Sequence, residues 1–332
     1  MAETVLADII IPEIFYPYVR EQSIYKNAFF QAGILSPSPQ ISDFLSGGSK
    51  TFNVPYWKAL TGDADVPSET VADTVNALTT DKMIAVRQIR HKAWGANALS
   101  AQLSGANPVE AIGSMVSDFW ATYFQNNLIH CLTGIIADNV AANSGDLVVD
   151  ISTETGTAAT AANKISATKT IEAMMKQGDR FGDIKAIAVH SAVYQTMVTN
   201  DLIDYVKDST LNVLIPYYLG MRVVVDDGLP VIAGGVDGYK YHSYLFKSGS
   251  VAFGENPGKI RPIETFRDPS KGSGIDILYT RRQFAFAPLG FSWDKASNAA
   301  VTPSHADLYA ATSWERVYNA KNTGIVCIVS NG

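Results

Sequence analysis

Cysteine is scarce in this sequence. Cys131 and Cys327 are the only two cysteines among 332 residues, and no C-x-x-C spacing joins them. Neither a disulfide framework nor a zinc site follows from two thiols so far apart in the sequence. Isolated thiols of this kind are typical of reduced, buried side chains in a cytosolic setting.

Long apolar runs and targeting segments are also missing. No stretch approaches the roughly 18 apolar residues that a transmembrane helix requires, so no membrane span is expected. The N-terminus carries Glu3 and Asp8 before a short apolar run at residues 9–11. A secretory signal would instead begin with cationic residues and end in a small-residue cleavage site. A membrane-surface helix is also disfavoured, because it would need a cationic face.

Positive charge is in deficit. Lys and Arg total 26 against 32 Asp and Glu, which gives a net charge of −6. Proteins that grip nucleic acid need clustered cations to neutralise the phosphate backbone. Direct recognition of DNA or RNA is therefore not expected.

The chain shows no constellation for catalysis or for binding a metal or cofactor. G-x-S-x-G and phosphate-loop patterns are absent. None of the histidines has a partner at the three- or four-residue spacing of a helical metal site; they are His91, His130, His190, His242 and His305. We therefore predict no catalytic residue, no metal ligand and no cofactor.

Asp226 and Asp227 offer an alternative. Two carboxylates after an apolar strand are a possible ligand site at the edge of an α/β sheet. The sequence Asp-Asp-Gly-Leu-Pro is also good turn chemistry, and we favour a turn. Ser191 is similarly better explained as a helix N-cap than as a nucleophile.

Residues 49–95 form the most informative stretch, because it reads as a long β-hairpin with too little apolar material to fold alone. Phe52, Val54 and Tyr56 share one face of a strand at residues 50–58, as a period of two requires. Pro55 cannot donate to a ladder, which favours an edge strand. An isolated two-stranded ribbon is at best marginally stable in water. The hairpin is therefore expected to pack against another part of the chain or against another molecule.

Charge is segregated along this hairpin. Its tip at residues 61–81 is acidic and has no Lys or Arg, whereas residues 82–92 form a basic, half-buried stem. Opposite signs suggest contact between copies, with the tip of one lying on the stem or body of the next. The alternative is a solvated surface hairpin, and this stretch alone favours neither. The candidate contact residues are Asp63, Asp65, Glu69 and Asp73 in the tip and Lys82, Arg87, Arg90 and Lys92 in the stem.

Residues 1–48 are rich in apolar and aromatic groups but are interrupted by proline. This pattern favours short helical pieces joined by extended chain over one helix. Such an arm cannot bury its own apolar surface, so it is expected to lie along the body or along a neighbouring subunit. Phe15 and Tyr16 are its candidate contact residues.

The strongest helix pattern runs from residue 107 to residue 140. Asn107 suits a cap and Pro108 the first helical position. Apolar residues then recur at steps of three and four along about 48 Å of helix, and its aromatic side chains favour packing on a sheet. Alternating strand and helix patterns follow from residue 165 to residue 253 and predict an α/β lobe. A long strand at 275–286 leaves this lobe, and a strand at 325–329 closes the chain.

Four stretches in the second half carry a resemblance to a known family. They are IPYYLGMRVVVDDGLP at 215–230, YLFKSGSVAFG at 244–254, TRRQFAFAPLGFSW at 280–293 and SWERV at 313–317. They follow an arm, an extended loop and a long helix, and this order resembles the major capsid proteins of tailed bacteriophages. The fold of that family was first associated with phage Hong Kong 97. The resemblance covers nearly the whole chain.

The resemblance implies an α+β capsid fold with distinct peripheral and axial domains. Its parts would be an N-terminal arm at 1–48, an extended β-hairpin loop at 49–95, a peripheral domain at 96–164 with a spine helix at 107–140, an axial domain at 165–268, a long peripheral-domain strand at 269–300 and a C-terminal segment at 301–332 that closes the fold.

The resemblance also implies a structural protein and not an enzyme. Hexamers and pentamers would close into an icosahedral shell around double-stranded DNA, assembled in the cytoplasm of a bacterial host and retained in the virion. Implied partners are other copies, a portal and decoration or cement proteins. The arm-like sequence begins almost at Met1, without a long charged helical region before it. This suggests a separate scaffolding protein or a chain already processed, and the initiating Met argues against processing.

Two other functions stay open on the sequence alone. One is an encapsulin-like compartment shell of the same fold, which would enclose an enzyme instead of a genome. The other, less favoured, is a soluble α/β hydrolase or binding protein that uses Asp226 and Asp227.

Overall fold

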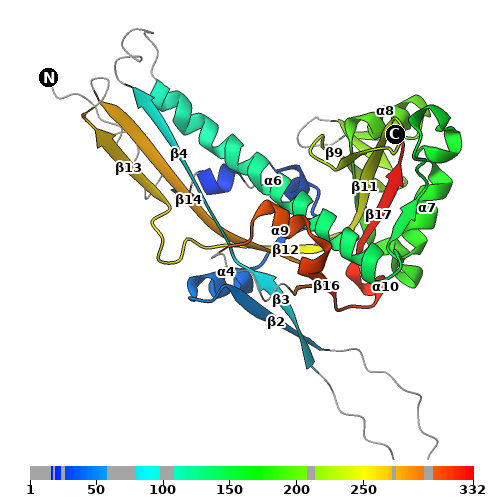
Figure 1. Cartoon of the computed structure of the whole chain (residues 1–332), viewed down its shortest axis with the longest axis horizontal. Coiled ribbons are helices and arrows are strands. Elements are labelled where there is room, and N and C mark those ends of the chain that lie inside the picture. The colour runs from blue at the N-terminus through cyan, green and yellow to red at the C-terminus, as the bar shows by residue number, and fades with distance from the viewer. Residues whose placement is uncertain are drawn as a thin grey trace, which may run out of the picture.

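The computed structural model shows an α/β lobe, an elongated sheet lined by one long helix, and a two-stranded hairpin that projects from their junction (Figure 1). The structure describes residues 16–17, 19–23, 27–57, 80–97, 108–207, 214–270, 274–294 and 302–332. The long helix runs along the elongated sheet and reaches the lobe, so the two parts share it (Figure 1).

Helix α6 (Pro108–Ala142) is this shared element and coincides with the long helix that the three- and four-residue spacing predicts. Its second half is buried on more than one face. Lobe strands pack on one side, while α9 (His305–Tyr309), η4 (Ala311–Ser313) and β16 (Trp314–Arg316) pack against it from the C-terminal segment. At Gly134 a Cβ would lie 2.1 Å from the carbonyl oxygen of Leu308. The buried surface is therefore wider than a single stripe.

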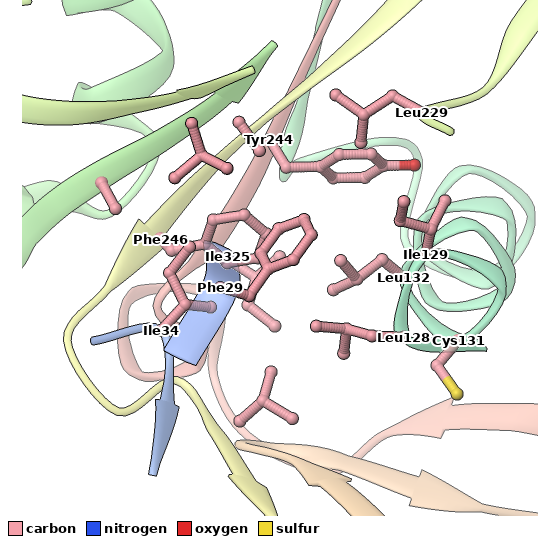
Figure 2. Close-up of a cluster of buried hydrophobic side chains, with 14 of the residues drawn as sticks. Phe29, Ile34, Leu128, Ile129, Cys131, Leu132, Leu229, Tyr244, Phe246 and Ile325 are labelled. Carbon is pink, nitrogen blue, oxygen red and sulfur yellow. The ribbon is translucent and has the colours of Figure 1, made fainter. Parts of the chain in front are cut away.

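The main core lies where α6 meets the lobe. Figure 2 shows Leu128, Ile129 and Leu132 of α6 pointing toward side chains from lobe strands and toward Phe29 and Ile34 of the predicted arm. Phe29 and Phe246 meet edge to face there, with ring centroids 6.1 Å apart. The N-terminal segment thus contributes to the same core as the last strands of the chain.

The lobe is built on a sheet of eight described strands in the order β5-β17-β11-β6-β9-β8-β7, with β10 paired to β11. Its strands β6 and β17 are buried at nearly every position, which explains their continuous apolar sequences. The strand bounds are β5 Val148–Asp150, β6 Ile184–Val189, β7 Asp204–Lys207, β8 Leu214–Tyr218, β9 Met221–Val225, β10 Val231–Ala233, β11 Tyr239–Lys247 and β17 Ile325–Ser330. Its helices are η1 Gly156–Ala158, η2 Ala161–Asn163, α7 Ala167–Met175, η3 Gly178–Asp183 and α8 Ser191–Thr199.

The elongated sheet has five described strands, and its central strand β14 (Ile275–Pro288) is 14 residues long. Strand β14 pairs with β4 Gln88–Asn97, β12 Val251–Glu255 and β13 Ile263–Asp268, and β1 Leu35–Pro37 pairs with β12. The projecting hairpin pairs β2 (Thr51–Trp57) with β3 (Thr80–Val86) in antiparallel register. Smaller elements are α3 Ala28–Gln31, α4 Pro39–Ser46, β15 Phe291–Trp293 and α10 Ala320–Thr323.

Strand pairing crosses the predicted domain limits at three points. The β2–β3 pairing ends at Val86, and β4 joins β14 instead of continuing the hairpin to residue 95. After β11 the chain reverses at Gly249, which has a φ of +67°, and β12 and β13 enter the elongated sheet although both lie within 165–268. Conversely, β5 and β17 complete the lobe sheet from outside that range. Closeness in sequence does not decide sheet membership, because strands pair through backbone hydrogen bonds wherever an unpaired strand edge is available.

One capping prediction is wrong. The side chain of His190, and not that of Ser191, caps α8: His190 Nδ1 accepts a hydrogen bond from the Ala192 backbone nitrogen at 3.2 Å. Ser191 is the first helical residue, and its backbone nitrogen donates to Asp227 Oδ1 at 3.1 Å.

Candidate functional site: the assembly surfaces

The β2–β3 hairpin buries one face against its own chain, as its period of two predicts. Phe52 is 8% exposed and its ring stacks on Phe44 of α4, with centroids 5.6 Å apart. A small core beneath it joins α4 to β3 and β14 and contains Ile41, Leu45, Phe52, Ala85, Ala285 and Ala287. At the far end of β2, by contrast, Trp57 is 67% exposed. The hairpin is therefore anchored at its base and offers a large apolar side chain further out.

Polar contacts fix the direction in which the hairpin leaves the body. The Ile84 backbone nitrogen donates to Ser292 Oγ at 3.0 Å, which attaches β3 to β15. On β2, the Tyr56 ring meets the Tyr318 ring edge to face at 4.5 Å, and its hydroxyl donates to the Val317 carbonyl at 3.4 Å. These contacts hold β3 beside β15 and the outer part of β2 beside the C-terminal segment.

The predicted stem cations divide into two groups. Arg90 is engaged within the chain, because its guanidinium donates to Tyr123 Oη at 2.6 Å, Thr302 Oγ1 at 2.8 Å and the Pro303 carbonyl at 2.6 Å. Arg87 donates to the Gly47 carbonyl, and burial lowers the pKa of its guanidinium.

Lys82 and Lys92 are exposed and can meet another molecule. The predicted tip residues Asp63, Asp65, Glu69 and Asp73 lie outside the described residues.

Tyr16, a predicted arm contact, packs inside its own chain. Its hydroxyl donates to Glu255 Oε1 at 3.3 Å, and the Arg282 guanidinium carbon lies 5.3 Å from its ring centroid. Burial, followed by the negative charge of Glu255, raises the pKa of the Tyr16 hydroxyl. Tyr16 therefore anchors the arm to the elongated sheet, whereas Phe15 lies outside the described part of the chain.

A buried ion pair under Tyr16 was not anticipated from the sequence. Arg282 Nη1 lies 2.5 Å from Glu255 Oε1, with side-chain exposures of 2% and 0%. Arg282 also donates to Ser23 Oγ at 3.3 Å, and Arg20 Nε approaches Glu255 Oε2 at 3.6 Å. The pair thus ties β12 and β14 to residues 16–23. The signal was present: Arg282 has the same strand parity as Phe284 and Phe286, which places a cation on an apolar face.

The possible catalytic residues serve structural roles. Asp226 accepts hydrogen bonds from Gln125 Nε2 at 2.6 Å and from the Gly228 backbone nitrogen at 2.8 Å, so the turn interpretation is supported. Burial raises the pKa of the Cys131 thiol to about 12, which leaves it protonated. Within the described ranges no cluster of three His, Cys, Asp or Glu could hold a metal ion. No described helix is both long enough and apolar enough to cross a membrane.

Two histidines meet although they are 175 residues apart in the numbering. The His130 and His305 rings stack with centroids 4.8 Å apart, and His305 Nε2 lies 2.7 Å from Tyr123 Oη. Burial lowers the pKa of both imidazoles, and the proximity of His130 and Arg90 lowers that of His305 further. The cluster fastens α9 to α6 and β4.

Comparison with known proteins decides the family. The model of the Gp13-like family, described as major capsid protein 13-like, matches residues 58–326. A major capsid protein of Bacillus phage SPP1 is 36% identical over 332 residues, which covers 98% of each chain. The chain belongs to the Gp13-like family of major capsid proteins. It is accordingly a structural component of a phage capsid, and the predicted recognition is confirmed.

Solved capsids share the fold of this major capsid protein. The cyanophage Pam1 capsid asymmetric unit matches with a TM-score of 0.60 at 10% identity, covering 93% of both chains. The capsid of Ralstonia phage GP4 matches with a TM-score of 0.61 at 7% identity, covering 92% of both chains. At such low identity these likenesses concern the fold alone, and they confirm the predicted α+β capsid fold of the Hong Kong 97 type. The domain limits stay predictions.

Proposed function

We propose that this chain assembles as hexamers and pentamers into the icosahedral shell that encloses the double-stranded DNA of a tailed phage. The observation that carries this proposal is its 36% identity to a phage major capsid protein across 98% of both chains. The role is structural and not enzymatic, and it requires no cofactor. A net charge of −6 is consistent with a shell that encloses DNA without binding it sequence-specifically.

The assembly surfaces would make many modest, repeated contacts between copies related by near-symmetry. The β2–β3 hairpin supports this, because it projects from the body and carries exposed Trp57 beyond its anchored base. Its acidic tip, with Asp63, Asp65 and Glu69, would meet the stem or body of the next copy. Exposed Lys82 and Lys92 supply the opposite charge.

Other components complete the proposed role. A separate scaffolding protein would guide assembly in the cytoplasm of the bacterial host, a portal would occupy one vertex, and decoration proteins would bind the outer surface. Pull-down of the capsid protein with each phage component during assembly would test these partners individually.

Negative-stain electron microscopy of the purified protein tests the central proposal. We expect ring-shaped capsomers or closed particles of megadalton mass, since a shell subunit must contact copies of itself. A chain that stays strictly monomeric across salt, pH and protein concentration would contradict it. Particles that contain protein cargo and no DNA when isolated from infected cells would instead point to a compartment shell.

Charge reversal tests the hairpin tip. Changing Asp63, Asp65 and Glu69 together to Lys is expected to reduce particle yield while leaving the melting temperature of the subunit nearly unchanged. The defect should weaken in high salt, because exposed charges are screened beyond roughly 10 Å at 0.1 M. Reversal of Glu264 to Lys on β13, in the elongated sheet and away from the hairpin, serves as the control. Normal yield of the tip variant at low salt would argue against a contact there.

A further inference from the structure

The two ends of the lobe sheet carry opposite charge. Strand β6 begins directly after η3, and the parallel strand β9 ends at Val225, immediately before Asp226. Tyr244 of β11 pairs with Ala188 near the end of β6, and the β10–β11 hairpin continues past it. Tyr239 and η3 therefore lie about 26 Å apart along the strands, at 3.3 Å per residue. In Figure 1 the end at Tyr239 lies on the side of the C terminus, and the end at η3 lies on the side of α10.

The end at η3 is basic and apolar, and we call it the basic end. Residues 175–185 carry Lys176, Arg180 and Lys185 against Asp179 and Asp183, and Lys247 and Lys321 pair with those two acids at 2.7 and 3.7 Å. Five cations against two acids leave an excess of three positive charges. Met175 is 49% exposed and Phe181 is 41% exposed among them. Exposed apolar side chains ringed by charge are typical of a docking surface.

The other end is acidic and apolar, and we call it the acidic end. Residues 226–241 carry three acids, Asp226, Asp227 and Asp237, against one cation, Lys240, and neighbouring Glu154 adds a fourth acid. Four acids against one cation leave an excess of three negative charges. The β10–β11 hairpin presents Val231 at 41%, Ile232 at 42% and Val236 at 78% exposure there.

The acidic end is held in a fixed shape despite its exposure. Glu154 Oε2 accepts from the Gly235 backbone nitrogen at 3.1 Å, and its other oxygen pairs with Lys240. The Val236 backbone nitrogen donates to the Glu154 carbonyl at 3.3 Å, and Gly234 and Gly238 close the turn at 3.0 Å. Ordering before association lowers the entropic cost of binding. Apolar side chains held in this way are better suited to a partner than to water.

We infer that the basic end of one copy docks on the acidic end of the next copy, in a head-to-tail contact between lobes. The inference rests on the proposed shell function and specifies which surfaces meet. Two different, complementary patches at opposite ends of one chain make a heterologous contact, and such contacts close into rings when the rotation permits. A second copy is the occupant because each end supplies the charge and the apolar surface that the other lacks.

Continuity with the projecting hairpin supports the same direction of contact. Tyr56, near the outer end of β2, touches Tyr318, the next element is α10, and Lys321 of α10 pairs with Asp179 of η3. The C-terminal segment therefore links the hairpin to the basic end. A neighbour docked on the basic end would approach the hairpin as well.

Exchanging the charges tests the contact. The basic-end variant carries Lys176→Glu, Arg180→Glu and Lys185→Glu, and the acidic-end variant carries Asp227→Lys and Asp237→Lys. Each alone should lower the yield of rings and particles at least about tenfold, because each change sets like charges opposite one another. Both sets in one chain should restore assembly, since the reversed ends again attract. Thermal melting of each variant checks that the subunit is folded.

Two further variants keep the test independent of local folding. Val236→Lys alters a side chain that is 78% exposed and should act like the acidic-end variant. The control variant is Lys259→Glu with Arg261→Glu, in the connection between β12 and β13 of the elongated sheet. If this control variant has an assembly defect, the acidic-end reversal should not rescue it.

Each outcome has a defined meaning. Normal assembly of either single-end variant at low salt, or failure of the combined variant to recover, overturns the head-to-tail contact. Failure of the unchanged chain to assemble overturns the proposed shell function instead.

Discussion

The lobe sheet and the β2–β3 hairpin use strands in opposite ways. Strands β6 and β17 are buried at nearly every position, so both of their faces are satisfied inside the chain. The hairpin alternates, with Phe52 buried, Asn53 exposed and Trp57 exposed at its end. A strand that is buried on both faces within its own chain carries a nearly continuous apolar sequence, whereas a strand with one exposed face can still contact another molecule. The open face is where assembly can act.

Truncating the lobe core should have the largest effect. Phe246 is 0% exposed and lies against Phe29 and Tyr244, so Phe246→Ala is expected to lower the free energy of unfolding by about 4 kcal/mol. Global chemical denaturation of the subunit measures the loss. A decrease below about 1 kcal/mol would mean that the lobe core is looser than its burial indicates.

Breaking the buried ion pair should come next. Arg282→Met removes the buried partner of Glu255 and leaves its carboxylate only the longer, half-exposed contact with Arg20 and the Tyr16 hydroxyl. This loss is expected to cost about 3 kcal/mol and to loosen residues 19–23. The double variant Arg282→Met with Glu255→Leu should recover most of that loss, because no lone charge stays buried. Hydrogen exchange of residues 19–23 reports the arm separately from global unfolding. Equal losses in the single and double variants would contradict this account.

The hairpin should respond locally. Phe52→Ala removes the ring that stacks on Phe44, and it is expected to increase hydrogen exchange in β2 and β3 while changing global stability by only about 1 kcal/mol. The matched change in the lobe is Phe246→Ala, which should raise exchange everywhere. A global loss as large as that of the lobe variant would show that the hairpin belongs to the same cooperative unit.

Acid should produce the smallest of these effects. The pKa values of His130 and His305 are lowered in the folded chain. As the pH falls below the ordinary histidine pKa of about 6.5, these two side chains therefore bind protons more readily in the unfolded chain than in the folded chain. Their contribution to stability is therefore intact above that pH and decreases as the pH falls toward the folded values.

The charge of Arg90 reinforces this direction, because its guanidinium would repel a protonated His305. Denaturation at pH 7.5 and pH 5.5 measures the decrease, and His305→Gln should flatten it. If the free energy of unfolding decreases equally between the two pH values in the unchanged chain and in this variant, the histidine pair is not the cause of the decrease.

The sequence by itself determined the local elements. The three- and four-residue spacing located α6, and the alternation of Phe52, Val54 and Tyr56 located β2 and its buried face. Such patterns can be read directly, because helix and strand periods are fixed by backbone geometry. The order of these elements was enough to recognise a capsid fold.

Only the tertiary structure decided which elements meet. It paired β4 with β14, inserted β17 between β5 and β11, and joined Arg282 to Glu255 beneath Tyr16. It also showed that Arg90 and Tyr16 make polar contacts within their own chain. The physical reason is that burial and strand pairing depend on residues far apart in sequence. A local helix or strand period shows which residues share a face, but it does not predict which distant element packs against that face.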